Sequence, residues 1–137
     1  MAFQNPPDET IKEVLATPQT VAVVGCSPNP ARDSHRIAKL LKAKGHRVIP
    51  VNPGHQEILD EKCYASLRDI PEKVDMVDIF RRSEQVAPII DQAIATGAKI
   101  VWMQLGVIDE RAAAKAQQAG LIVVMDRCPA IEYRRLF

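Results

Sequence analysis

The segment Thr20–Gly45, TVAVVGCSPNPARDSHRIAKLLKAKG, decides the fold class of this chain. It opens with Thr20–Gly25, a continuous apolar run rich in β-branched residues. Such a run is typical of a strand that is buried on both faces of a parallel sheet. Gly25 closes the strand where the backbone has to turn sharply, and the loop Cys26–Arg32 follows. We therefore predict a buried strand that ends in a tight turn.

A helix is predicted directly after that loop. Ile37, Leu40 and Leu41 recur at helical spacing, and Asp33 or Ser34 can cap the first turn. Gly45 stands where the residue that follows a helix often takes a left-handed conformation. A buried strand, a loop and a helix in this order form the first part of a right-handed βαβ unit.

The rest of the chain repeats this alternation of strand and helix. Further strands are predicted over 46–52, 61–65, 74–80, 99–104 and 121–125, and further helices over 8–17, from Val86 to Gly97 and from Asp109 to Gly120. Such alternation favours a parallel sheet with helices on both faces. If Glu61–Ala65 is the third strand, the fold is a Rossmann-like, doubly wound α/β sheet with strand order 3-2-1-4-5-6 and three layers, α/β/α.

One domain accounts for the whole sequence. The chain has 137 residues, of which 47% are apolar, so it can bury one core but has no room for a second folded domain. We expect residues 1–18 to form a lead segment with the first helix and residues 19–128 to form the core. Residues 129–137 form a C-terminal tail with no assigned structure.

Charge balance and the length of apolar runs exclude several classes of protein. The 18 basic residues nearly balance the 17 acidic ones, which argues against broad binding to nucleic acid or a membrane surface. Val21–Val24 and Leu121–Met125 are far shorter than the roughly 18 residues of a membrane-spanning helix, and Met1–Asp8 lacks the pattern of a secretory signal. The sequence therefore predicts a cytoplasmic protein without a nucleic-acid or membrane partner.

The reversal of strand order locates the expected binding site. Ligands of such sheets bind beyond the carboxyl ends of the strands at the reversal, which here lies between the first and fourth predicted strands. The loops that meet there are Gly25–Asn29, Asn52–His55, Phe80–Arg82 and Gln104–Gly106. Behind the first of these loops, the N-terminus of a helix offers unpaired N–H groups and a positive dipole end, which suit a phosphate.

Basic and polar side chains can add to this anion site. Arg81 and Arg82 directly follow a buried strand, so at least one guanidinium should project at the mouth of the crevice. An exposed basic pair at the start of a loop is the alternative. Arg32, Ser34 and His35, at the start of the helix, can donate to the same anion or can simply be solvated residues of its first turn.

A nicotinamide cofactor fits the sequence less well than another phosphate-bearing ligand. Ser27 and Pro30 stand where the fingerprint G-x-G-x-x-G has its second and third glycines. Asn52 ends the second strand, where a NAD site uses an acidic residue to accept the ribose hydroxyls.

Motifs for catalysis or metal binding are not recognised. The cysteines form no C-x-x-C pair and the histidines no H-x-x-x-H pair, so no metal site is predicted. A thiol near a helix N-terminus can be reactive, but we expect Cys26 to be packed in the core, and likewise Trp102. Cys63 and Cys128 are assigned no chemistry. With no motif for a nucleophile or general base, a binding role is favoured over an enzyme.

Four segments carry a resemblance to a known family. They are VAVVGCSPNPARDSHRIAKLLKAKGHRVIPVNP, VDMVDIFRRSEQV, KIVWMQLGVI and VVMDRCPAIEYRRL. In this order and spacing, the chain resembles the small bacterial and archaeal CoA-binding proteins of the YccU-like family over nearly its whole length. That family is similar in turn to the N-terminal CoA-binding domain of the succinyl-CoA synthetase α subunit. The resemblance implies a Rossmann-like fold that holds coenzyme A at the point of strand reversal.

The resemblance also implies roles for particular residues. It assigns the phosphate-linked part of CoA to Gly25, Cys26 and Ser27, the surroundings of the nucleotide to Asn52 and Pro53, and the two sides of the crevice to Phe80, Arg81, Gln104 and Gly106. The synthetase-type pattern has a lysine shortly after the proline of the second strand, where this chain has Gly54 and His55. Ligase activity is not implied, because the synthetase's phosphorylated histidine lies in a following domain.

Three functions remain open at this point. The leading hypothesis is a protein that binds CoA or an acyl-CoA without catalytic machinery of its own. The second is an enzyme, either an NAD(P)-dependent oxidoreductase or a CoA-dependent transferase that borrows catalytic groups from another chain. The third is a protein-interaction module with a vestigial crevice, in which a sheet edge or helix face forms a homodimer or a complex with another protein.

Overall fold

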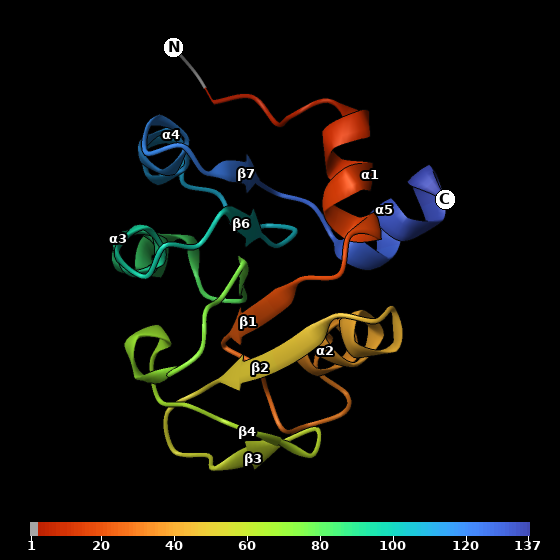
Figure 1. Ribbon diagram of the computed structural model, residues 1–137, viewed down its shortest axis with the longest axis vertical. Coiled ribbons are helices and arrows are strands. Elements are labelled where there is room, and N and C mark those ends of the chain that lie inside the picture. The colour runs from red at the N-terminus through yellow and green to blue at the C-terminus, as the bar shows by residue number, and fades with distance from the viewer. Residues whose placement is uncertain (1–2) are drawn as a thin grey trace.

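Five strands form one parallel sheet (Figure 1). They are β1 (Thr20–Val24), β2 (Arg47–Val51), β5 (Met76–Ile79), β6 (Ile100–Met103) and β7 (Ile122–Val124). The computed structural model describes residues 3–137, so residues 1 and 2 of the predicted lead segment lie outside the described residues. The strands lie in the order β2-β1-β5-β6-β7, and every neighbouring pair is parallel. The order therefore reverses at β1, which has β2 on one side and β5 on the other.

Helices cover both faces of this sheet, as the sequence predicts. α1 (Asp8–Ala16), α2 (Asp33–Ala43) and α5 (Pro129–Leu136) lie on one face, and α3 (Val86–Ala95) and α4 (Glu110–Gln118) lie on the other (Figure 1). The doubly wound arrangement in three layers is confirmed. None of the helices within residues 3–137 combines the length and the apolar character that crossing a membrane requires.

Strand side chains alternate between two cores. Val23, Met76 and Trp102 pack beneath α1, α2 and α5, whereas Val24 and Val77 pack beneath α3 and α4. Burial on both faces is the reason that these strands are continuous apolar runs in the sequence. Trp102 is 0% exposed, which confirms its predicted place in the core.

The prediction of a sixth strand in the main sheet is wrong. Of residues 61–65, β4 (Glu61–Lys62) pairs antiparallel with β3 (Glu57–Ile58) in a separate hairpin. Tyr64 alone among these five residues pairs with the main sheet through its backbone, in one parallel bridge to Val51. The order 3-2-1-4-5-6 therefore loses its outermost strand, while the order of the other five is as predicted.

Two local features explain why this strand stops so early. Leu59 and Asp60 have φ values of 55° and 60°, so the chain turns back as a two-residue hairpin before it reaches the sheet edge. At that edge, Tyr64 N–H donates to the Pro50 carbonyl at 3.1 Å, and Asn52 N–H donates to the Tyr64 carbonyl at 2.9 Å. The next bond of this ladder would need an N–H at position 50, which proline lacks. β2 is therefore an edge strand.

The helix caps agree with the sequence at α4 but not at α2. Neither Asp33 nor Ser34 caps α2, because Arg32 occupies the N-cap position and makes no side-chain cap bond. The Ser34 hydroxyl is instead engaged with the loop before the helix. Asp109 caps α4 as predicted, accepting a hydrogen bond from Ala112 N–H at 3.0 Å.

The predicted tail 129–137 is helical rather than irregular, because it contains α5 with a proline at its start. α5 packs beside α1, where Arg135 donates two hydrogen bonds to Asp8 at 2.8 and 2.9 Å. The segment before α1 crosses to the end of the last strand. There the Asn5 side chain donates to the Met125 carbonyl at 2.9 Å and accepts from the Met125 N–H at 2.7 Å.

A buried polar network joins α5 to the edge of the sheet. His46, which is 4% exposed, accepts a hydrogen bond at Nδ1 from Gln19 N–H at 3.0 Å, and its Nε2 lies 2.9 Å from the Tyr133 hydroxyl. Tyr133 in turn donates to the Leu15 carbonyl at 3.1 Å. These partners match a neutral ring that carries its proton on Nε2. Burial lowers the pKa of His46 below its ordinary value.

We expect His46 to make the protein less stable in mild acid. Its lowered pKa contributes stability that is present above about pH 6.5 and is lost as the pH falls, because the unfolded chain takes up a proton that folded His46 resists. Urea unfolding at about pH 7.5 and about pH 5.5 measures this loss. His46→Gln should reduce it, whereas His55→Gln, at an exposed loop position, should leave it unchanged. Equal pH dependence in wild type and His46→Gln would contradict the expectation.

Candidate functional site

A crevice of about 940 Å³ lies at the carboxyl ends of β1, β5 and β6. The loops after these three strands line it, together with Ile37 and Leu40 of α2 and with Cys128 and Ala130 at the start of α5. This is the place where the strand order reverses, and α/β sheets bind their ligands at such places. The crevice therefore lies where the sequence predicts a binding site.

The crevice brings together seven of the predicted site residues: Gly25, Ser27, Arg32, Ser34, Phe80, Arg81 and Gln104. Its lining does not include Cys26, His35, Asn52, Pro53 or Gly106. A direct role for any of these residues in ligand contact stays a prediction.

Sequence reasoning missed most of the apolar part of the crevice. It used Ile37 and Leu40 only as evidence for a helix, assigned no chemistry to Cys128, and left Ala130 in a tail without assigned structure, although all four line the crevice. Helical periodicity marks a side chain as buried without showing whether a protein core or a ligand covers it. For α5, a proline at the first helical position was the available signal.

Gly25 sets the distance between β1 and β5 at the base of the crevice. Its φ is +89°, and a Cβ at this position would lie 2.2 Å from the Phe80 carbonyl oxygen. On its other side, Gly25 N–H donates to the Val51 carbonyl at 2.8 Å. Only glycine tolerates both the backbone conformation and the close approach. The incomplete dinucleotide fingerprint thus retains the one glycine that the turn requires.

Side chains hold the loop after β1 in place. Ser34 Oγ accepts a hydrogen bond from Ser27 N–H at 2.9 Å, and His35 Nδ1 lies 2.9 Å from the Ser27 carbonyl. From the end of β2, Asn52 Nδ2 donates to the Cys26 carbonyl at 2.8 Å. His35 and Asn52 therefore support the crevice from behind, by fixing the backbone of the loop.

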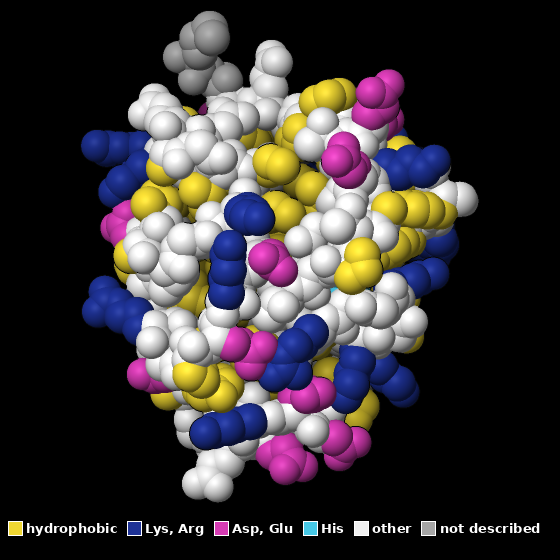
Figure 2. Space-filling model, viewed as in Figure 1, with side chains coloured by type: hydrophobic (Ala, Val, Ile, Leu, Met, Phe, Trp, Pro, Cys, Tyr) yellow, Lys and Arg dark blue, Asp and Glu magenta, His cyan; other side chains and the backbone are white. Residues whose placement is uncertain are grey.

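Three guanidinium groups give the crevice a positive character. Arg32, Arg81 and Arg82 all line it, and none of them forms an ion pair with any residue in 3–137. Arg36, which also lines it, is paired with Asp33. Elsewhere, on the face that Figure 2 shows, basic and acidic side chains are interspersed. Together with the N-terminus of α2, the three arginines form a local site for an anion.

A buried carboxyl lies beneath the crevice. Asp78 of β5 is 0% exposed, and its Oδ1 accepts a hydrogen bond from Nε2 of Gln104, which lines the crevice. Burial raises the pKa of Asp78 to about 7. Sequence reasoning missed this residue, although a charged side chain within an apolar strand was a visible signal.

Burial determines the chemistry of the cysteines. Cys26 is 0% exposed, and burial, with smaller contributions from Cys63 and Asp78, raises the pKa of its thiol to about 12. Its predicted place in the core is confirmed, and a reactive thiolate at this position is not supported. Burial also raises the pKa of Cys63. Within residues 3–137, no group of His, Cys, Asp and Glu side chains is arranged to hold a metal ion.

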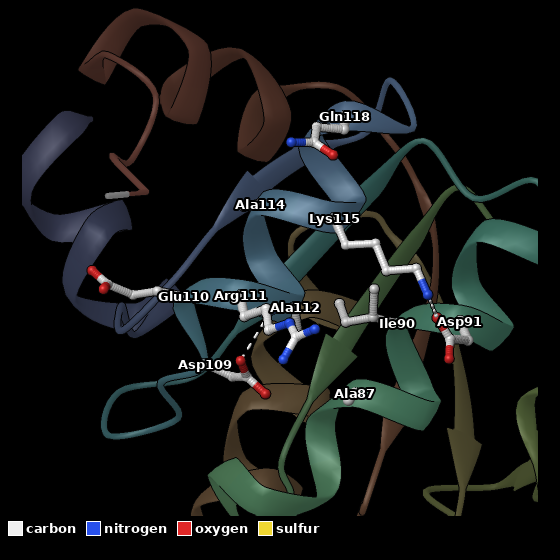
Figure 3. Close-up of a pocket in the computed structure, with 10 residues that line it drawn as sticks. All are labelled: Ala87, Ile90, Asp91, Asp109, Glu110, Arg111, Ala112, Ala114, Lys115 and Gln118. Carbon is white, nitrogen blue, oxygen red and sulfur yellow. Dashed lines mark hydrogen bonds and ion pairs between the residues drawn. The ribbon is translucent and has the colours of Figure 1, made fainter. Parts of the chain in front are cut away.

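A second hollow, of about 590 Å³, lies between α3 and α4 (Figure 3). Lys115 reaches across from α4 to Asp91 at 2.7 Å, and Asp109 is engaged in capping α4. None of the sequence-predicted site residues lines this hollow, and it lies away from the point of strand reversal. The crevice is therefore the stronger candidate site.

Comparison with known families identifies the class of this domain. A family model described as a CoA binding domain matches residues 19–134, which is most of the chain. The chain belongs to this family. The resemblance to small CoA-binding proteins that the sequence motifs indicate is thereby confirmed.

Relatives of this CoA-binding domain occur both alone and within larger proteins. The YneT protein of Bacillus subtilis is 39% identical over 126 residues, which cover 92% of this chain and 93% of YneT. The structure of a hypothetical protein from Pyrococcus horikoshii is 41% identical, with a TM-score of 0.90 and coverage of 99% of both chains. An ADP-forming acetate–CoA ligase from Archaeoglobus fulgidus is 35% identical over 96 residues, which cover 67% of this chain but only 14% of the ligase.

Gly25→Ala should destabilise the CoA-binding domain more than Gly45→Ala does. Both glycines have positive φ, 89° and 95°, so each alanine adds backbone strain of about 1–2 kcal/mol. The Gly25→Ala methyl group also meets the Phe80 carbonyl, whereas nothing lies within 4 Å of the corresponding position at Gly45. We expect the clash to cost about 1–3 kcal/mol more. Urea unfolding of both variants tests this, and equal losses would count against it.

Cys128 should react with a thiol reagent faster than Cys26 or Cys63. Cys128 is partly exposed in the crevice, whereas the other two thiols are buried and burial raises their pKa values. Brief alkylation of the folded protein with N-ethylmaleimide, followed by peptide mass spectrometry, measures the three rates. A ligand in the crevice should slow the reaction at Cys128. Faster modification of Cys26 than of Cys128 would contradict the structure.

Proposed function

We propose that this domain binds coenzyme A, or an acyl-CoA, in the crevice at β1, β5 and β6. The observation that carries the proposal is the combination of two surfaces in one crevice. Three arginines that make no ion pair within residues 3–137 lie near the N-terminus of α2, and apolar side chains of α2 and α5 line the same space. CoA has two matching parts, a nucleotide that carries phosphates and a long, largely uncharged pantetheine arm.

The polar part of the crevice suits the phosphates. Arg32, Arg81 and Arg82 offer planar sets of N–H donors, which match phosphate oxygens. Ser34 uses a lone pair to accept from the Ser27 N–H, so its own O–H can still donate to a ligand oxygen. The first N–H groups of α2 add the positive end of its dipole.

The size and the apolar lining suit the arm of the ligand. Small-molecule sites occupy roughly 300–1,000 Å³, and the crevice, at about 940 Å³, lies at the upper end of that range. Ile37 and Leu40 of α2 line this space together with Cys128 and Ala130, at the start of α5. These side chains can cover the methylene and methyl groups of a pantetheine arm.

The same crevice supports NAD less well. Ser27 and Pro30 occupy the positions of the second and third glycines of the dinucleotide fingerprint. Asn52, at the end of β2, is not an acidic acceptor for ribose hydroxyls, and its amide is engaged with the Cys26 carbonyl. The donor set therefore favours CoA over a nicotinamide cofactor.

We further propose that the domain holds CoA without carrying out a reaction by itself. The crevice lining offers cations, hydroxyl groups, an amide, the Cys128 thiol and the Asp33 carboxylate, which is paired with Arg36, whereas the Cys26 thiol is buried and keeps its proton at neutral pH. A second candidate is a CoA-presenting subunit of a larger enzyme. It is favoured by the ADP-forming ligase in which a similar domain makes up 14% of the chain. A homodimer, or a complex with another protein, stays a prediction.

Arg81→Ala should weaken CoA binding by roughly ten- to a hundredfold, because a hydrogen bond to a charged group contributes about 1.5–3 kcal/mol. Arg81 has no ion-pair partner within residues 3–137, so its removal leaves no charge unpaired in that part of the chain. Arg81→Lys should recover part of the affinity, since lysine keeps the charge but lacks the planar set of donors. Isothermal titration calorimetry with CoA, with circular dichroism to confirm folding, measures these effects.

Arg111→Ala is the matched control, because Arg111 lies in the hollow between α3 and α4 rather than in the crevice. It should bind CoA as the wild type does. A parallel titration with NADH tests the competing reading. Binding of NADH but not CoA by the wild-type protein would overturn the proposed function, and equal CoA affinity in wild type and Arg81→Ala would remove Arg81 from the site.

A further inference from the structure

Asp78 places a carboxyl group in the middle of an otherwise apolar sheet. In register, it pairs with Val23 of β1 and Trp102 of β6, and it is 0% exposed. On each of these three strands, the residue two positions further along lines the crevice: Gly25, Phe80 and Gln104. Side chains two apart on a strand point to the same face. Asp78 therefore lies directly beneath the crevice.

Only one of the two oxygens of the Asp78 carboxyl has a hydrogen-bond partner within residues 3–137. Oδ1 accepts a hydrogen bond from Gln104 Nε2, while Oδ2 is buried and has no hydrogen-bond partner within residues 3–137. Burying a polar oxygen without a partner costs folding free energy. A leucine has the same branched shape and would pack between Val23 and Trp102 at no such cost. Stability therefore does not account for an aspartate at this position.

Gln104 connects the carboxyl to the crevice. Its side chain is 4% exposed and is part of the lining. An ionised carboxylate can only accept hydrogen bonds, so Asp78 holds the NH₂ end of the Gln104 amide and prevents the amide from turning over. The carbonyl oxygen Oε1, at the other side of the same amide, is then the atom left for the crevice.

We propose that Asp78 is a positioning residue, which holds Gln104 so that Oε1 is a fixed acceptor for an uncharged hydrogen-bond donor of the bound ligand. In CoA, such donors are the amide N–H groups of the pantetheine arm and the adenine amine. The inference rests on the proposed function, because it assigns a contact within the same crevice. In this proposal, different residues recognise different parts of the ligand. The arginines bind phosphate, whereas Gln104 Oε1 accepts a neutral donor and repels a ligand oxygen in the same place.

Calorimetric titration with CoA tests this contact in Asp78→Leu, Gln104→Leu and Asp78→Asn. It is done at about pH 8, above the pKa of about 7 at which Asp78 ionises. Asp78→Leu and Gln104→Leu should each weaken CoA about three- to tenfold, which corresponds to one neutral hydrogen bond. Asp78→Asn keeps a carbonyl oxygen for the Gln104 NH₂ group, so its affinity should stay within about twofold of the wild type.

Two further measurements separate positioning from a structural role. The double variant Asp78→Leu/Gln104→Leu should melt at the wild-type temperature or above, because it removes a half-satisfied buried carboxyl without leaving the Gln104 amide unpaired. The double variant Asp78→Leu/Gln104→Leu should bind CoA no more weakly than either single variant, since both substitutions remove the same contact. Titration with the nucleotide half of CoA shows which part of CoA carries the hydrogen-bond donor that Gln104 Oε1 accepts. A loss seen only with whole CoA places it on the pantetheine arm, and a loss seen with both ligands places it on adenine.

Four results would overturn the role of Asp78. They are wild-type CoA affinity in Asp78→Leu, equally weak binding in Asp78→Asn and Asp78→Leu, additive losses of affinity in the double variant, and a melting temperature of the double variant well below that of the wild type. If the wild-type protein does not bind CoA at all, the proposed function fails, and this contact fails with it. If the wild-type protein binds CoA and the variants bind it equally well, the role of Asp78 is overturned while the proposed function stands.

Discussion

The close approach of β1 and β5 at Gly25 and Phe80 is the constraint on which the rest of the site depends. A side chain at Gly25 would meet the Phe80 carbonyl at 2.2 Å, so the two strands can end side by side only because this residue is glycine. From that point the chain continues into the loop before α2 on one side and into Arg81 on the other. The N-terminus of α2 and the arginines after β5 therefore face a common space. A wider separation of these two strand ends would place the same groups on different surfaces.

The polar groups around the crevice fall into two kinds. The side chains of Ser34, His35 and Asn52 form hydrogen bonds with the backbone of the loop after β1. Arg32, Arg81 and Arg82, by contrast, form no ion pair with the residues that the structure describes. A rigid frame with uncommitted cations is a preorganised site, because little order has to be gained when a ligand arrives. Under the proposed function, the arginines contact the ligand, whereas the other residues shape the loop around it.

The layered fold could be predicted from the sequence because burial on both faces leaves a direct mark, a continuous apolar run, in each strand. The prediction of a third strand in the main sheet was wrong because its pairing needs a backbone N–H that Pro50 lacks. The apolar pattern of a sequence does not show which backbone donors are available at a strand edge. The sequence also predicts where the crevice lies, since strand order determines where loops meet. The pairing of Asp78 with Gln104 lies outside such reasoning. These residues are 26 positions apart, and only the register of neighbouring strands brings them together.

The contacts between the first and last helices have a consequence for the way this domain is connected. Arg135 of α5 binds Asp8 of α1, and Asn5 forms hydrogen bonds with Met125 at the end of β7. The last helix therefore packs beside the first. The end of α5 thus lies close to the start of α1. A short bridge between the end of α5 and the start of α1 would leave every strand with the same neighbours. A chain that begins at another surface loop, with α5 joined to α1, would then keep the edge of the sheet that bears the crevice.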